Sequence, residues 1–204
     1  MKIKEFNNIY QFKISLKGIK PKIWRRIQVP ENYSFWDLHV AIQDVMGWFD
    51  CHLHQFHVNN QVTGGPEFIG IPNDDKFEDE VPILPGWKMF ISDFFSLNKK
   101  NFLYEYDFGD SWNHDIFLEK ILSKKPDTMY PICLAGERAC PPEDCGGSYG
   151  YEDFIKIIKD PQHKEYKNMM KWSGGNFDPE LFDPSEVVFT NPKSRLKMLG
   201  LRGI

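Results

Sequence analysis

The chain has 204 residues, of which 41% are hydrophobic and 15% aromatic, which excludes wholesale disorder and allows one substantial core. Its 25 basic and 29 acidic residues give a formal charge of −4, which excludes a surface built throughout to coat nucleic acid or anionic membrane. No apolar run reaches the ~18 residues that cross a bilayer, and the N-terminal residues lack the apolar core of a signal peptide. We therefore expect a cytoplasmic protein without membrane association.

The first two predicted elements are strands, because apolar residues alternate over residues 9–16 and again over 22–29. The second strand places Arg25 on its apolar face, where the guanidinium must find a partner or reach solvent. Trp24 and Arg26 point to the other face. Basic side chains around a tryptophan can bind phosphate, and a solvated sheet face is the alternative.

A helix is predicted from Ser34 to Gly47, with Ser34 and Asp37 as a capping box and the glycine as its stop. The stretch HLHQFHV then has the pattern of a strand, in which a period of two puts His52 and His54 on one face. Histidines spaced in this way can ligate one ion, and ordinary polar residues on a half-exposed strand are the alternative.

The middle of the chain alternates between irregular and regular stretches. Residues 59–87 are rich in glycine, proline and acids and show no sustained period, which predicts a long loop. A short helix capped at Ser92 is expected next, followed by strands over 102–108 and 111–122. Residues 122–150 are again heavy in proline and glycine, and no strand is expected there.

Helices are predicted over 150–160 and 163–172, and short helical turns follow at 183–188 and 191–199. The segment from 189 to the C-terminus is expected to be a basic tail or short helix. Because strands come mostly early and helices mostly late, the predicted class is α+β, with a mixed or mainly antiparallel sheet and helices packed on it. We expect the whole chain, residues 1–204, to form a single domain.

The hairpin between the two central strands carries the densest polar cluster, in the stretch YEYDFGDSWNHD. If residues 109–110 form a two-residue turn, position 107 faces 112 and position 105 faces 114. That register puts carboxylates beside an imidazole, as metal binding or general acid–base chemistry requires. The shared face would carry Glu105, Asp107, Trp112 and His114. The alternative is a hairpin whose aspartate caps its own turn and whose His114 pairs with Glu105.

The loop ERACPPEDCGG can fix the positions of charged side chains, because its two prolines restrict the backbone. Arg138, Glu143 and Asp144 surround that pair, and an ion-paired loop covering the core is the alternative. The cysteines nearby lack the C-x-x-C spacing of a structural zinc site, which favours plain reduced thiols. The sequence also lacks a P-loop, G-x-G-x-x-G, G-x-S-x-G or H-E-x-x-H motif.

Five stretches, KPKIWRRIQVP, GWFDCHLHQF, YEYDFGDSWNH, ERACPPEDCGG and NFDPELFD, occur in this order and resemble the plasmid pRiA4b ORF-3-like family from about residue 10 to 188. The resemblance implies an α+β domain of mobile-element type and brings no activity, substrate or cofactor with it. Many matching positions are polar residues that a core would not demand, which indicates a shared surface or cleft. They are Trp24, Arg25, Arg26, His52, His54, Tyr106, Asp107, Gly109, Asp110, Trp112, His114, Arg138, Pro141, Pro142, Glu143, Asp144, Gly146 and Gly147.

Our leading hypothesis is a binding or accessory module whose polar and aromatic cleft holds nucleic acid or another charged partner. Arginines would neutralise acids or phosphate, and tryptophans would supply stacking area. The binding residues would be Trp24, Arg25, Arg26, Trp112 and Arg138.

The alternative hypothesis is a metal-dependent hydrolase, such as a nuclease, with a divalent transition metal (zinc, manganese or iron) as cofactor. Glu143 or Asp144 would serve as general base. Both hypotheses require the hairpin, the PPED loop and the HLH strand to meet, and the sequence leaves open whether the protein is an enzyme. The metal ligands would be His52, His54, Asp107, Asp110 and His114.

Overall fold

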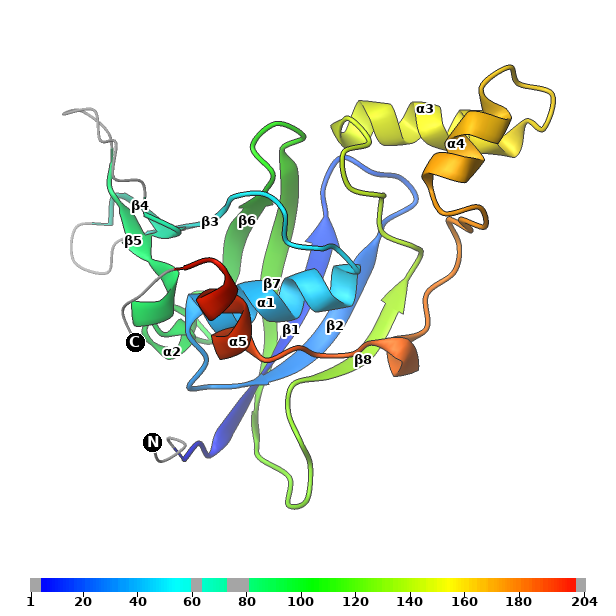
Figure 1. Cartoon of the computed structure of the whole chain (residues 1–204). Helices are drawn as coiled ribbons and strands as arrows, with labels where there is room; N and C mark the ends of the chain where they lie inside the picture. Colours follow the sequence, from blue (N-terminus) through cyan, green and yellow to red (C-terminus); the bar gives the residue numbers. More distant parts are fainter. Residues whose placement is uncertain (1–4, 60–63, 73–80, 201–204) are drawn as a thin grey trace.

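The computed structural model describes residues 5–59, 64–72 and 81–200 of the chain (Figure 1). Eight strands in these ranges form one sheet in the order β5-β4-β3-β6-β7-β1-β2-β8. Neighbouring strands are antiparallel, except that β4 and β5 run parallel, so the predicted α+β class with a mainly antiparallel sheet is confirmed. The strands are β1 (Asn8–Leu16), β2 (Trp24–Pro30), β3 (His54–Asn59), β4 (Pro66–Gly70), β5 (Ile83–Pro85), β6 (Asn101–Tyr106), β7 (Trp112–Ser123) and β8 (Ile132–Glu137).

Helix α1 lies across one face of the sheet, while α3 and α4 project from one end of it (Figure 1). The main hydrophobic core fills the space between α1 and the sheet. No helix in the described ranges has the length and apolar character that crossing a bilayer requires. The helices are α1 (Phe35–Met46), α2 (Ile91–Phe94), α3 (Gly147–Lys159), α4 (Tyr166–Trp172) and α5 (Pro192–Met198), with 3-10 turns η1 (Gly86–Lys88) and η2 (Pro184–Glu186).

Helix α1 begins and ends as its sequence predicts. The Ser34 hydroxyl accepts a hydrogen bond from the Asp37 backbone N–H (3.1 Å), and the Asp37 carboxylate accepts one from the Ser34 N–H (2.8 Å). Gly47 ends the helix in the left-handed conformation (φ 86°) that glycine adopts without steric penalty. These caps fix the rotation of α1, and with it the residues that it presents to the sheet.

Three strands lie where the sequence predicted irregular chain. β4 and β5 fall within residues 59–87, of which 60–63 and 73–80 lie outside the described residues, and β8 falls within 122–150. β5 and β8 are the edges of the sheet and β4 is short, so backbone pairing rather than side-chain alternation defines all three. The predicted cap at Ser92 is also wrong, because α2 begins at Ile91 without a side-chain cap.

The register of the β6–β7 hairpin differs from the prediction by one residue. Tyr106 pairs with Trp112 and Tyr104 pairs with His114, so residues 107–111 all belong to the turn. His114 and Trp112 therefore face the core, whereas Glu105 points to the opposite face of the sheet. The predicted common face for Glu105 and His114 is wrong, and so is the direct pairing of these two residues.

The C-terminal segment contacts β8 through η2 and then runs back to α1, against which α5 packs (Figure 1). The Trp36 indole donates to the Pro192 carbonyl (2.9 Å), and Thr190 N–H donates to the Asp44 carboxylate (2.8 Å). Leu196 on α5 is buried. The helical turns expected at 183–188 and 191–199 are thus present as η2 and α5, and the last turn is docked rather than loose.

Candidate functional site

Three segments that are distant in sequence meet at one end of the sheet: the loop between α1 and β3, the β6–β7 turn, and the loop before α3. Gly146 N–H donates to Asp110 Oδ2 (3.1 Å), which joins the turn to the PPED loop. Phe49 N–H donates to Glu143 Oε2 (3.0 Å), which joins that loop to the segment before β3. The hairpin, the PPED loop and the start of the HLH stretch therefore converge.

The turn and the loop hold their aspartates in unusual backbone conformations. Asp107 (φ 56°) and Asp144 (φ 58°) are both left-handed, a conformation that aspartate tolerates better than most residues. Asp107 Oδ1 accepts hydrogen bonds from the N–H groups of Gly109 (3.0 Å) and Asp110 (3.3 Å), so this aspartate caps its own turn. The second oxygen of Asp107 remains directed toward the neighbouring segment.

His52, Asp107 and Asp144 form a cluster that we call the surface cluster. His52 Nε2 lies 3.0 Å from Asp144 Oδ1 and 3.6 Å from Asp107 Oδ2. One ligand atom from each residue lies within 4.8 Å of the other two. The exposed fraction of the side chains rises from 10% at Asp107 through 30% at His52 to 71% at Asp144, so solvent reaches the cluster from the Asp144 side.

Negative charge collects around the surface cluster. Asp110 and Glu143 lie on the same two loops as Asp107 and Asp144. In the described ranges, the ion pairs of lysine and arginine go to other acids and leave these four carboxylates without a cationic partner. His52 is the basic side chain that contacts them. An excess of carboxylates beside an imidazole favours the binding of a cation.

Glu143 holds the site together. Its Oε1 accepts a hydrogen bond from the Tyr106 hydroxyl (2.5 Å), and its Oε2 accepts the Phe49 N–H bond. Burial and the neighbouring Glu143 raise the pKa of Tyr106, so the phenol stays protonated and keeps donating. Both oxygens of Glu143 are therefore engaged, which does not fit the general-base role expected for this residue.

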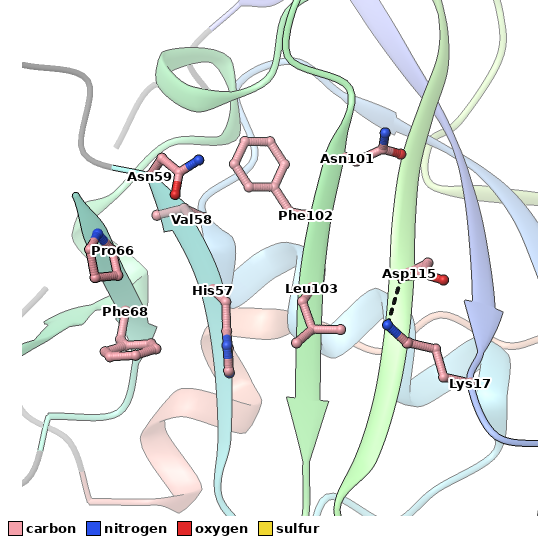
Figure 2. A pocket seen from close by; sticks show the side chains of 10 residues that line it. All are labelled: Lys17, His57, Val58, Asn59, Pro66, Phe68, Asn101, Phe102, Leu103 and Asp115. Atoms are coloured by element: carbon pink, nitrogen blue, oxygen red, sulfur yellow. Dashed lines mark ion pairs between the residues drawn. The ribbon is translucent and has the colours of Figure 1, made fainter. Parts of the chain in front are cut away.

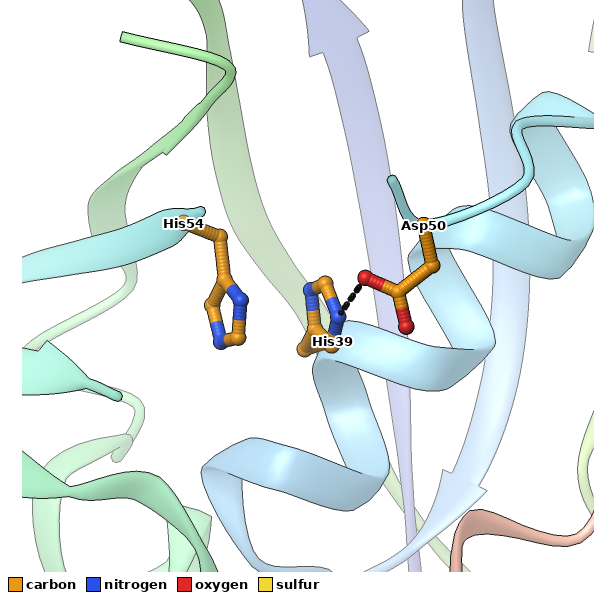
Figure 3. A group of neighbouring side chains, drawn as sticks. All are labelled: His39, Asp50 and His54. Atoms are coloured by element: carbon orange, nitrogen blue, oxygen red, sulfur yellow. Dashed lines mark hydrogen bonds and ion pairs between the residues drawn. The ribbon is translucent and has the colours of Figure 1, made fainter. Parts of the chain in front are cut away.

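A second cluster lies inside the molecule, between α1 and β3 (Figure 3). We call His39, Asp50 and His54 the buried cluster. His39 Nε2 lies 2.8 Å from Asp50 Oδ1, and the imidazoles of His39 and His54 stack with centroids 3.4 Å apart and planes 7° from parallel. Burial holds the pKa of His39 and that of His54 well below the usual range, so both rings are neutral.

The five predicted metal ligands do not share one centre. His52 and Asp107 meet in the surface cluster, whereas His54 belongs to the buried cluster, because β3 begins at His54 and His52 lies in the preceding loop. Asp110 is bound to Gly146 N–H. His114 lies in the core, where its Nδ1 contacts the Trp112 carbonyl (3.0 Å) and burial lowers its pKa to about 4.

The predicted binding arginines are mostly structural. Arg25 is only 1% exposed and donates to the carbonyls of Val45 (2.8 Å) and Glu137 (3.0 Å), while its guanidinium stacks over the Phe182 ring at 3.7 Å. Arg138 is also buried and forms an ion pair with Glu180 (2.8 Å). Neither guanidinium is available to a partner in this arrangement.

The remaining predicted binding residues are dispersed. Trp112 is buried in the core at 2% exposure. Trp24 and Arg26 lie on the sheet face away from α1, where Arg26 is already paired with Glu119 at 2.7 Å. A single cleft that combines these aromatic and basic side chains with the acidic loops is therefore not formed by the described residues.

A shallow groove of about 410 Å³ lies on this outer face of the sheet, over β3, β4 and β6 (Figure 2). Phe68 and Leu103 line it beside His57, and a 3.5 Å ion pair between Lys17 and Asp115 closes one side. Its lining contains none of the predicted site residues. The groove lies on the other side of the sheet from the buried cluster, so it adds nothing to either cluster.

Sequence reasoning missed two members of the buried cluster, His39 and Asp50. A signal for His39 was present: it lies four residues before Gln43, on the side of α1 that carries the apolar stripe. Two polar residues at that spacing on a buried helix face indicate an internal network. No comparable signal marks Asp50, which lies in a loop and reaches the cluster only through the fold.

Comparisons with known proteins agree with this fold. The family model for plasmid pRiA4b ORF-3-like protein matches residues 8–186. The uncharacterized protein y4hQ of Sinorhizobium fredii (strain NBRC 101917 / NGR234) is 31% identical over 169 residues, which cover 83% of this chain and 82% of that protein. The crystal structure of MM3350, a protein of unknown function from Methanosarcina mazei Go1, is 50% identical with a TM-score of 0.84, and the match covers 91% of this chain and 100% of that one. Neither description names an activity, so the chemistry of the site rests on its geometry.

Proposed function

The chain belongs to the plasmid pRiA4b ORF-3-like family, and we propose that it is a binding module that holds a divalent transition metal at the surface cluster and an anionic partner through that ion. The observation that carries this proposal is the approach of His52 Nε2 to the carboxylates of Asp144 (3.0 Å) and Asp107 (3.6 Å). A cytoplasmic location and a nucleic-acid partner remain predictions that accompany it.

The donor set favours zinc, manganese or iron. One imidazole nitrogen and two carboxylate oxygens form a mixed site of the kind that these ions accept. Three protein donors leave at least one coordination position for water or for an oxygen of a ligand. Asp144, whose side chain is 71% exposed, lies on the side from which such a ligand would approach.

The charge of the loops explains why a metal would be needed. Four carboxylates at this end of the sheet repel phosphate or carboxylate groups, and Arg25 and Arg138 are engaged inside the protein. A bound divalent ion would be the largest local charge and would reverse the attraction. The metal thus connects two features that the sequence suggested separately, a charged partner and a histidine–aspartate site.

Hydrolysis of a phosphate ester is the second candidate function. The open coordination position favours it, because a metal-bound water can supply hydroxide that attacks phosphorus while the ester oxygen leaves with a proton. Glu143 has both oxygens in hydrogen bonds, however, and Asp144 would already be a ligand. Since no free base remains among the proposed residues, binding ranks above hydrolysis.

Titration of the chelator-stripped protein with manganese or zinc tests the proposal. We expect His52→Gln and Asp107→Asn each to weaken binding at one site at least tenfold. The matched control is His57→Gln, because His57 pairs with Glu105 at 3.2 Å and is 32% exposed, close to the 30% of His52. Inorganic phosphate should bind to the metal-loaded protein and not to the stripped one.

Two outcomes would change this view. If His52→Gln binds as many equivalents of metal as His57→Gln does, and as tightly, the surface cluster is not a metal site. If the loaded protein cleaves bis(p-nitrophenyl) phosphate and His52→Gln does not, the site is hydrolytic rather than only a binding site.

A further inference from the structure

We propose that the buried cluster is a second metal site, in which His39, Asp50 and His54 hold one transition-metal ion that ties α1 to β3. This inference does not depend on the proposed function of the surface cluster, because the two clusters share no residue. Its role is structural, since the donors lie between two elements of the core rather than at an open surface (Figure 3).

The first observation is that His54 is buried without partners. It is 2% exposed, and within the described residues neither Nδ1 nor Nε2 has a hydrogen-bond partner. A buried polar group left unsatisfied destabilises the fold, so buried nitrogens of this kind in native proteins normally face a water or an ion. His54 has two such nitrogens on one ring.

The second observation is the donor set around that ring. One ligand atom each from His39, Asp50 and His54 lies within 4.8 Å of the other two. Both imidazoles are neutral, which is the form that ligates metals, and Asp50 supplies a carboxylate whose other oxygen lies 3.5 Å from Arg195. Two histidines and one carboxylate are a ligand set that zinc and iron accept.

A chain of hydrogen bonds through Gln43 and Tyr104 holds the His39 ring. Gln43 Nε2 donates to the Tyr104 hydroxyl (2.9 Å), which lies 2.8 Å from His39 Nδ1, and His39 Nε2 lies 2.8 Å from Asp50. Partners of this kind fix the orientation of metal-binding histidines. His39 is therefore positioned before any ion binds.

The same chain can reverse its direction when Nε2 of His39 binds a metal. Nδ1 must then carry the proton and donate to the Tyr104 oxygen, and the Tyr104 O–H must find another acceptor. Gln43 Oε1 is buried and lacks a partner in the described part of the chain, so turning the amide over supplies that acceptor.

Binding requires a small rearrangement. Donors around a tetrahedral ion with bonds of ~2.1 Å lie about 3.4 Å apart, so the cluster contracts, and one stacked ring turns about its Cβ–Cγ bond to aim its lone pair at the ion. Asp50 and its neighbours form a surface loop in which Phe49 is 82% exposed and Cys51 is exposed. Opening of this loop gives the ion a route to His54.

Zinc titration of the chelator-stripped full-length chain, followed by elemental analysis after desalting, tests the inference. We expect two equivalents in the wild type and one in each of three variants: His52→Gln loses the surface ion, whereas His39→Gln and His54→Gln lose the buried one. His114→Gln, which changes another fully buried histidine outside both clusters, should keep two. Zinc should raise the Tm of His52→Gln by more than that of His54→Gln, because only the ion retained by His52→Gln would tie α1 to β3.

If His54→Gln binds the same amount of zinc as His114→Gln, the inference is overturned, whatever happens at His52. Should the buried variants fail to fold, X-ray absorption of cobalt-loaded His52→Gln decides: two imidazole nitrogens in the first coordination sphere support the inference, and one or none overturns it. A crystal soaked in zinc that shows only a water at His54 would also overturn it, and would leave the surface site untouched.

Discussion

Burial sets the protonation state of three histidines in this protein. His39, His54 and His114 are almost fully buried, and burial lowers the pKa of each. His114 is the simplest case, because it belongs to neither cluster. Its Nδ1–H donates to the Trp112 carbonyl (3.0 Å), its Nε2 has no partner among the described residues, and Tyr104 and the charged Arg25 lie nearby.

The depressed pKa of His114, about 4 against an ordinary value of 6.5, predicts acid destabilisation with a defined window. The unfolded chain binds a proton at this residue below about pH 6.5 while the folded chain does not until about pH 4. Stability is therefore complete above pH 6.5 and falls as the pH drops toward 4, by about 2–3 kcal/mol from this residue. Urea unfolding of metal-free protein at pH 7.5 and 4.5 measures the loss.

His114→Gln removes the titrating group and serves as the comparison. The variant should lose about 2–3 kcal/mol less than the wild type between the two pH values, even if it is less stable at both. Equal losses would show that His114 does not stay neutral in the folded protein.

Arg25 illustrates what a sequence shows about one residue. Its alternation pattern correctly placed a guanidinium on the apolar face of β2, where it had to find a partner. The partners are the carbonyls of Val45 and Glu137, at the end of α1 and in β8. Neither could be inferred, because backbone acceptors leave no signal in side-chain identity and β8 itself was not predicted.

At the scale of elements, the contact between the β6–β7 turn and the start of α3 holds the surface cluster in place. Gly147 is left-handed (φ 66°), and a Cβ added there would lie 2.6 Å from the Asp110 carbonyl oxygen. Only a residue without a side chain allows the two loops to approach so closely. The distance between Asp107 and Asp144 therefore depends on a glycine.

Gly147→Ala is expected to destabilise the protein and to weaken metal binding at the surface cluster. The left-handed alanine costs about 1–2 kcal/mol, and displacing the Asp110 backbone adds about 1–3 kcal/mol. Gly174→Ala is the matched control, because Gly174 has φ +90° but nothing within 4 Å of an added Cβ. Urea unfolding and manganese titration of both variants measure the difference.

The control should show only the smaller loss of stability, with unchanged metal affinity. If both variants behave alike, the contact at Asp110 does not position the cluster.

The elements that sequence predicted well are those that carry their own pattern. α1 has a capping box, a stripe of apolar residues and a terminating glycine, and apolar and polar residues alternate along β1. Both elements therefore appear where expected. The predicted hairpin register was wrong because left-handed Asp107 and Ser111 extend the turn beyond Gly109 and Asp110. Edge strand β8 was not predicted because its pairing with β2 requires no alternation of apolar and polar residues in its sequence.

At the scale of the whole molecule, the sequence identified the residue types of the site but not their grouping. His52 and His54 looked like one ligand pair, yet the chain enters β3 between them and sends them to different clusters. Asp107 and Asp144 meet only because the sheet order brings the β6–β7 turn beside the loop before α3. Such convergence follows from topology, which short-range patterns do not determine.

The docked C-terminal segment predicts that the chain unfolds as one unit, as expected for a single domain. Arg195 binds Asp44 (2.8 Å) and approaches Asp50 (3.5 Å), so α5 supports both α1 and the loop of the buried cluster. Deleting the chain after residue 188 would expose Trp36 and remove Thr190 and Arg195 from the buried Asp44 carboxylate, while Asp50 would keep only its contact with His39. We expect a loss of about 2–4 kcal/mol with a single transition retained in both proteins. Tryptophan fluorescence and far-UV circular dichroism should give coincident urea curves for each protein.

Lys193→Ala, which changes an exposed residue of α5, should unfold like the wild type. Two separate transitions in the full-length chain, or a truncated chain of unchanged stability, would mean that the C-terminal segment is an appendage rather than part of the fold.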